Sequence, residues 1–182
     1  MCMKWTQVGM AVGLALMLGA CVSPPQYPET PGSDVDPNFD FKNLRDSLDQ
    51  YKGSVFQVAG EMVRVESGSE GVRVMANRRW IQHQQSYPYN IPVESGEPPQ
   101  DRFLVSYPGK LDAQGLKLGN KFVAVVELAG ASGDLLSFRV RCMHVWKTGQ
   151  SRISELPDRF VQLYQALEED TYCATGAQAA AR

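Results

Sequence analysis

The chain has 182 residues, 43% of them hydrophobic and 21% charged, a composition typical of one globular domain that excludes a collagen, a heptad array or a wholly disordered protein. Its 18 basic and 20 acidic residues give a formal charge of −2 without a long basic run, so we expect no nucleic-acid partner. The four cysteines and two histidines match no zinc-binding spacing, and we expect neither a metal site nor a cofactor.

The N-terminus has the features of a signal peptide. Lys4 is the only charged residue before an apolar stretch from Val8 to Leu18. This stretch is about 11 residues long, whereas a helix needs roughly 20 residues to span the hydrocarbon core of a membrane. We therefore interpret residues 1–20 as a secretory signal peptide and not as a membrane anchor.

The signal peptide is followed by a candidate lipidation site. Leu18-Gly19-Ala20-Cys21 resembles the lipobox of bacterial lipoproteins. Small side chains let a peptidase approach the bond before Cys21, and a thiolate can accept a diacylglyceryl group as a thioether. We expect Cys21 to carry acyl chains such as palmitate. The alternative is an ordinary secretory signal with a chance cysteine near its cleavage site.

Residues 21–38 are rich in proline and other turn formers, which predicts a flexible linker between the lipid and the domain. Val22, and not an aspartate, follows the lipidated cysteine. By resemblance to Gram-negative sorting, this residue implies release to the outer membrane, with the domain facing the periplasm.

A short amphipathic helix is expected at the start of the domain. Asp40 is the expected N-terminal cap and Gly53 the expected stop. The apolar residues at helical spacing are Phe41, Leu44, Leu48 and Tyr51.

From Ser54 onward the hydrophobic period changes from 3.6 to 2, which is typical of strands. A bulge near Gly60 would explain why Val63 and Val65 reverse the phase. Turns are expected at 67–71 and 129–134. The expected strands are 54–65, 72–76, 102–106, 121–128 and 135–146. The expected inward positions are Phe56, Val58, Val74, Phe103, Val105, Phe122, Ala124, Val126, Phe138 and Val140.

About five strands with short links predict a mainly β fold, a small antiparallel β-barrel, with one long excursion from about Gln82 to Asp101. Such a barrel resembles the OB fold that binds oligonucleotides and oligosaccharides, although a fold does not assign a ligand.

A C-terminal amphipathic helix is expected to close the domain. Pro157 suits its first turn, and the apolar face consists of Phe160, Leu163, Tyr164 and Leu167. The acidic residues 168–170 oppose the helix dipole and should fray its last turn. We expect one domain over residues 39–172 and a disordered tail over 173–182.

Cys142 and Cys173 are predicted to form a disulfide. Cys2 is removed with the signal peptide and Cys21 is lipidated, so this pair is left in a compartment that oxidises thiols. On the strand alternation, Cys142 is expected to face inward with Val140.

Parts of the strands resemble the Slp family of starvation-inducible outer-membrane lipoproteins. With the lipobox, the resemblance covers most of the chain up to Trp146. It implies a small β domain at the outer membrane with a stress-related role, and no defined reaction. The segments that carry it are 58–65 (VAGEMVRV), 102–105 (RFLV), 109–112 (GKLD), 118–126 (LGNKFVAVV) and 145–146 (VW).

The chain has no convincing catalytic motif. The segments 68–71 and 130–133 lack the GxSxG spacing and are expected to be turns. His83 and His144 could act as bases, but no Asp or Cys motif accompanies them. Cys142 and His144 share a strand face about 7 Å apart, where packing is the simpler role. We expect no catalytic residue and no enzyme.

The loop over residues 80–101 is the best candidate for recognition. Arg79 and Trp80 begin it, and Tyr87 and Tyr89 follow, a mixture of cation and aromatic rings that can hold sugars, peptides or lipid headgroups. The alternative is a proline-rich loop whose tyrosines cover the mouth of the barrel. A pocket lined by Arg79 and these tyrosines would favour binding, and a barrel filled by side chains would not.

Two classes of function follow. The favoured one is a noncatalytic cell-envelope lipoprotein, anchored to the outer membrane through Cys21, with a structural or stress-related role and an envelope protein as its partner. The alternative is a periplasmic module that binds a small molecule or glycan on a barrel face or on the loop 80–101. A periplasmic hydrolase is the third alternative.

Overall fold

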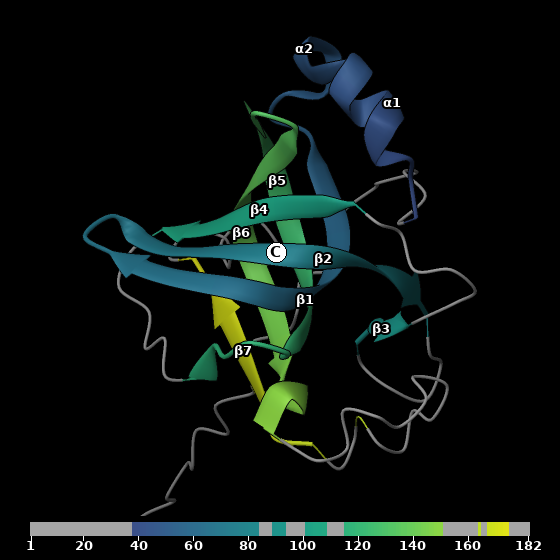
Figure 1. Cartoon of the computed structure of the whole chain (residues 1–182). Helices are drawn as coiled ribbons and strands as arrows, with labels where there is room; N and C mark the ends of the chain where they lie inside the picture. The colour runs from purple at the N-terminus through teal and green to yellow at the C-terminus, as the bar shows by residue number, and fades with distance from the viewer. Residues whose placement is uncertain are drawn as a thin grey trace, which may run out of the picture.

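A computed structural model describes residues 38–83, 89–93, 101–108, 115–150, 164 and 167–174. This part of the chain is mainly β, as the sequence predicts (Figure 1). Its elements are α1 (Phe41–Asp46), α2 (Leu48–Tyr51), β1 (Val55–Gly68), β2 (Gly71–Gln82), β3 (Ile91–Val93), β4 (Arg102–Pro108), β5 (Lys121–Ser132), β6 (Leu135–Trp146), a 3-10 turn (Thr148–Gln150) and β7 (Glu169–Cys173).

Five of the strands close into a ring. β1 pairs with β2, β2 with β4, β4 with β6, β6 with β5, and β5 again with β1. β3 extends the sheet at β2, and β7 extends it at β6. The result is a barrel-like sheet, as expected from the short links between strands.

The expectation of a purely antiparallel barrel is wrong at one pairing. β4 and β6 run parallel, with Phe103 opposite Leu136 and Ser106 opposite Arg139, while the other four pairings of the ring are antiparallel. The reason is topological: strand direction cannot alternate all the way around a ring of five strands, so one neighbouring pair must be parallel.

Side chains fill the ring. All ten residues predicted to point inward are buried members of one apolar cluster, which we call the inner cluster. The alternation predicts these positions because one face of each strand meets this core and the other face meets solvent or a covering segment. α1 lies over one end of the ring (Figure 1), where the buried Phe41 contacts Phe103 and Phe138 at centroid distances of 5.5 and 6.0 Å.

The N-terminal helix begins and ends where predicted, with a break in the middle. The carboxylate of Asp40 accepts a hydrogen bond from the backbone N–H of Lys42 at 2.8 Å, and Gly53 follows the helices with φ of 82°. Ser47 separates α1 from α2. Asn38, predicted to be in the linker, instead belongs to the fold because its side chain exchanges two hydrogen bonds with the backbone of Ile81.

Two details of the strand prediction need correction. The bulge in β1 lies between Met62 and Arg64, and not near Gly60. Gly60 has another role, because a Cβ there would approach Ala76 Cβ to 2.9 Å. The turn expected over 129–134 is also shorter, since β5 and β6 remain paired as far as Ser132 and only Gly133-Asp134 connects them.

The C-terminal part of the chain differs most from the prediction. Glu169 and Asp170, expected at the frayed end of a helix, lie in β7. Cys173 lies in the same strand, so the tail does not begin there, and Ala174 still donates to the carbonyl of Arg141 at 2.8 Å. Most of the predicted helix over 157–167 lies outside the described residues, as does the tail over 175–182.

A second cluster lies outside the ring, and we call it the outer cluster. Tyr164 is buried within it and donates its hydroxyl hydrogen to the carbonyl of Pro92 at 2.6 Å. Tyr164 is thereby fixed to β3. The members of the outer cluster are Ala59, Ile81, Ile91, Val93, Val123, Trp146 and Tyr164, with Trp80, Tyr89 and Leu167 packed against them.

Candidate functional site

Of the residues predicted for recognition, the three that the structure describes, Arg79, Trp80 and Tyr89, do not line the pocket found in the described part of the chain. Arg79 forms an ion pair with Glu61 of the neighbouring strand β1. Trp80 and Tyr89 are partly buried against the outer cluster. Tyr87 lies outside the described residues. Trp80 and Tyr89 therefore serve packing at the outer cluster, whereas the alternative considered for the tyrosines placed them over the mouth of the barrel.

Arg78 connects the N-terminal segment to the barrel. It is only 5% exposed, and its Cζ lies 4.2 Å from the ring centroid of Phe41 and 5.2 Å from that of Trp80. Its guanidinium donates to the carbonyl of Phe39 and lies 3.5 Å from a carboxylate oxygen of Asp101. A buried cation with aromatic faces and a carboxylate around it is a structural clamp.

His83 also has a structural environment. Its Nδ1 lies 2.8 Å from Oδ1 of Asn90, and Nδ2 of Asn90 donates to Oε1 of Gln57 at 2.6 Å. These contacts tie the residues before β3 to the end of β2 and to β1. The histidine is part of a polar chain at the surface.

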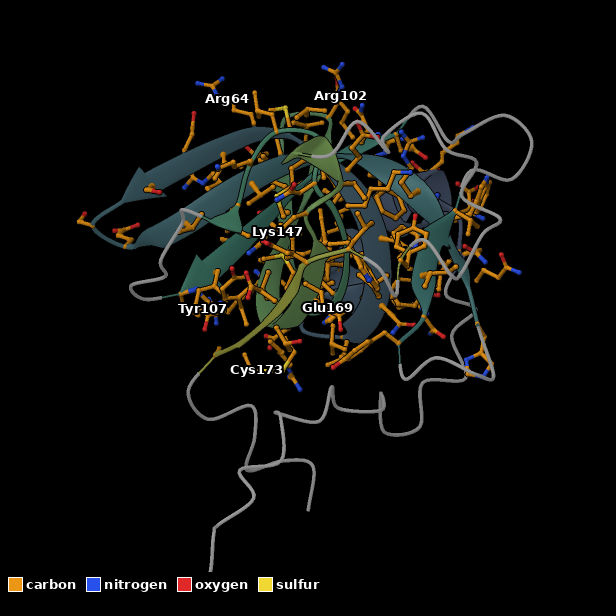
Figure 2. All side chains as sticks on the ribbon, turned by 90° about the horizontal axis from the view of Figure 1, so that it is seen from below. Arg64, Arg102, Tyr107, Lys147, Glu169 and Cys173 are labelled. Atoms are coloured by element: carbon orange, nitrogen blue, oxygen red, sulfur yellow. A yellow bond between two sulfur atoms is a disulfide. The ribbon has the colours of Figure 1, made fainter. Side chains whose placement is uncertain are left out.

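His144 is the most heavily buried titratable side chain of the outer face, with 1% exposure. Nδ1 lies 2.7 Å from the hydroxyl of Thr171, and Nε2 lies 3.2 Å from a carboxylate oxygen of Glu169. Tyr89 stacks on the imidazole at 3.7 Å between ring centroids, and Trp146 meets it edge-on at 4.5 Å. Figure 2 labels Glu169 on β7. Sequence patterns single out the histidine but do not predict β7. The partners of His144 on this strand, Thr171 and Glu169, were therefore missed.

The partners of His144 determine its tautomer. The carboxylate of Glu169 can only accept, so Nε2 carries the proton, and Nδ1 accepts from the hydroxyl of Thr171. A hydroxyl, an imidazole and a carboxylate in a row are the parts of a nucleophile relay. Here the stacked Tyr89 and the edge of Trp146 cover the imidazole, which gives the arrangement a packing role.

Stability should depend on pH through His144. Burial lowers the pKa of His144 below its ordinary value of 6.5, against Glu169 and Asp170, which raise it. The unfolded chain therefore binds a proton near pH 6.5 that the folded chain binds only at lower pH. The stabilisation from neutral His144 is full above pH 6.5 and is lost as the pH falls towards the folded-state pKa, by at most about 1.4 kcal/mol per pH unit.

Urea unfolding between pH 7.5 and pH 5 measures this slope. H144Q should flatten it, while H83Q, which removes the only other histidine, should leave it unchanged. An unchanged slope in H144Q would show that other groups cause the pH dependence.

Cys142 and Cys173 form a disulfide, the pair predicted from the sequence. They lie opposite each other on β6 and β7. Tyr107 of β4 donates to the carbonyl of Cys173 at 2.7 Å, and burial raises the pKa of this phenol. The disulfide and this hydrogen bond hold the end of β7 against the ring, where Figure 2 labels both Tyr107 and Cys173.

The expected orientation of Cys142 is wrong. An extra residue, Arg141, interrupts the pairing of β6 with β5. Val140 before this bulge and Met143 after it both belong to the inner cluster. Because successive residues of a strand point to opposite faces, Cys142 lies on the outer face, together with His144.

A pocket of about 500 Å³ lies beside the β1–β2 hairpin and was not predicted. The β1–β2 hairpin forms one wall, and the end of β4 together with Arg139 of β6 forms the rest. Arg73, Ser106 and Arg139, from three different strands, lie on its surface. No local motif unites these three residues in the sequence, because only the pairing register of the barrel brings them into one row.

Neither the family models, nor the curated proteins, nor the solved structures compared with this chain gave a match. Within the described ranges, no helix has the length and apolar character needed to cross a membrane. Those ranges also contain no group of three or more His, Cys, Asp or Glu side chains arranged to hold a metal ion.

Proposed function

We propose that the protein is an outer-membrane lipoprotein, anchored through Cys21, whose noncatalytic β domain faces the periplasm in a structural or stress-related role. The observation that carries this proposal is Leu18-Gly19-Ala20-Cys21 directly after a short apolar stretch. The resemblance to Slp lipoproteins supports the same location.

Two features of the domain support the proposal. A disulfide between Cys142 and Cys173 suits an oxidising compartment such as the periplasm. The inner cluster fills the ring, and the imidazole of His144 is covered by Tyr89, so neither offers a substrate a reacting group. An envelope protein is the partner class that fits a domain held at the membrane.

The alternative function, a ligand-binding module, rests on a specific observation. The pocket beside the β1–β2 hairpin provides about 500 Å³ of space on the barrel face, within the range of small-molecule sites. None of the described residues of the loop 80–101 lines this pocket, and a lipid-anchored protein can carry both functions.

Lipidation is tested by C21S. Without the thiol, no acyl chain can be attached, so we expect unprocessed precursor and complete loss of the acyl mass in spectra of the purified protein. C2S is the matched control, because it removes a cysteine outside the lipobox that takes no part in the disulfide, and it should leave the acyl mass unchanged. Equal processing of wild type and C21S would contradict the proposal. V22D in the same host should move the protein from the outer to the inner membrane fraction.

A further inference from the structure

We propose that the pocket beside the β1–β2 hairpin binds a phosphate-type oxyanion between Arg73 and Arg139. The inference deepens the ligand-binding alternative and does not depend on the lipid anchor. It rests on strand register, on the shape of the pocket and on the ion pairs around it.

The register sets the two arginines on either side of Ser106. Arg73 of β2 lies opposite Ser106 of β4, and Ser106 lies opposite Arg139 of β6. Residues opposite one another on adjacent strands point to the same face. Since neighbouring strands are about 4.8 Å apart, the two arginine backbones lie roughly 10 Å apart, and their long side chains can converge on one anion above the serine.

Small residues make the hollow between these side chains. Ser106 donates its hydroxyl hydrogen to the carbonyl of Phe138 at 3.2 Å, so it forms a low floor and leaves the donors to the arginines. The hairpin wall contains Gly68, Ser69 and Gly71, which fill little space. An anion of phosphate size has room above the serine.

The carboxylates that lie opposite the two arginines on the same row are already paired with other arginines. Glu66, opposite Arg73, forms an ion pair with Arg64 at 2.6 Å. Glu127, opposite Arg139, forms one with Arg141 at 3.1 Å.

Within the described ranges, neither Arg73 nor Arg139 forms an ion pair with a carboxylate, and both are exposed. Two guanidinium groups with several donors each are therefore available for an oxyanion, the group that arginine binds with paired hydrogen bonds.

Two acidic residues line the pocket, Glu66, which is paired with Arg64, and Glu70, and the second bears on the kind of phosphate. Glu70 lies at the tip of the hairpin and also lines the pocket. It should repel a free phosphate and attract a phosphate that carries an ammonium group, as in an ethanolamine lipid headgroup. Free phosphate and the lipid headgroup would both bind through the phosphate group, and the charge of Glu70 would distinguish between them.

The test is calorimetric titration of the full chain in detergent, at constant ionic strength, with inorganic phosphate and with glycerophosphoethanolamine as probes. Each of R73Q and R139Q should weaken binding by about tenfold or more, because each removes charge-assisted hydrogen bonds. R102Q is the matched control: Arg102 is an exposed arginine of β4 that bonds Asn77, does not line the pocket, and lies away from Tyr107 in Figure 2.

Binding that R102Q retains and the two pocket variants lose supports the site. A tighter fit for glycerophosphoethanolamine that E70Q removes assigns the ligand to a lipid headgroup, whereas phosphate binding that E70Q strengthens assigns it to free phosphate. No heat of binding for either probe, or an equal loss in R102Q, overturns the proposal. C21S should bind like wild type, so a failed anchor and a failed pocket give different results.

Discussion

Replacing Cys142 and Cys173 together with serine should lower the free energy of unfolding by about 3 to 4 kcal/mol. The disulfide closes a loop with a sequence separation of 31 residues, and a loop of that length restricts the unfolded chain by an amount of this size. The loss is a large share of the 5 to 15 kcal/mol that holds a typical domain together. Urea unfolding of the wild type and the double variant measures it.

The reason for so large an effect lies in β7. Among the described residues this strand pairs with β6 alone. Its Thr171 and Glu169 hold His144, so a loosened β7 would expose that imidazole as well. Reductant should reproduce the loss in the wild type and have no effect on the double variant. Equal urea midpoints for oxidised wild type and double variant would contradict the prediction.

F138A should lower the free energy of unfolding by about 3 to 5 kcal/mol, the range for truncating a buried phenylalanine to alanine. Phe138 has 0% exposure, and its ring lies 5.9 Å from Phe103, 6.0 Å from Phe41 and 6.3 Å from Phe56, measured between centroids. Truncation leaves a cavity where α1 meets β1, β4 and β6.

A matched truncation of an exposed apolar side chain separates the effect of lost packing from the effect of shortening an apolar side chain. L118A removes a side chain that is 61% exposed, so the change should stay within about 0.5 kcal/mol. Thermal or urea unfolding of both variants gives the comparison. Equal losses in F138A and L118A would mean that the ring of strands does not enclose Phe138.

Local patterns explain why much of the barrel could be predicted. The alternation at Val72, Val74 and Ala76 reports one buried face, and the glycine-containing hairpins report the turns between strands. The cap at Asp40 and the stop at Gly53 are signals of the same local kind.

The errors arise where distant segments meet. The bulge at Arg141 shifts the phase of β6 by one residue and turns Cys142 to the outer face, a change that alternation cannot reveal. Glu169 and Asp170 look like the end of a helix until β6 offers a free edge for pairing. Pairing with β6 and the disulfide to Cys142 both favour a strand at this position over the frayed last turn of a helix.

The pocket could not be predicted for the same reason. Arg73, Ser106 and Arg139 are isolated polar residues in their strands, and each alone suggests only a solvated face. Their juxtaposition requires the parallel pairing of β4 with β6, which follows from closure of the whole ring.

The intact mass of the protein purified without reductant from the outer membrane of a Gram-negative host tests the central claim most directly. A lipoprotein of the proposed kind has a chain that starts at Cys21, carries the mass of a diacylglyceryl group, and is two hydrogens lighter than its reduced form because Cys142 and Cys173 are joined. A soluble, correctly cleaved chain with an unmodified Cys21 thiol would contradict the anchor and the function built on it.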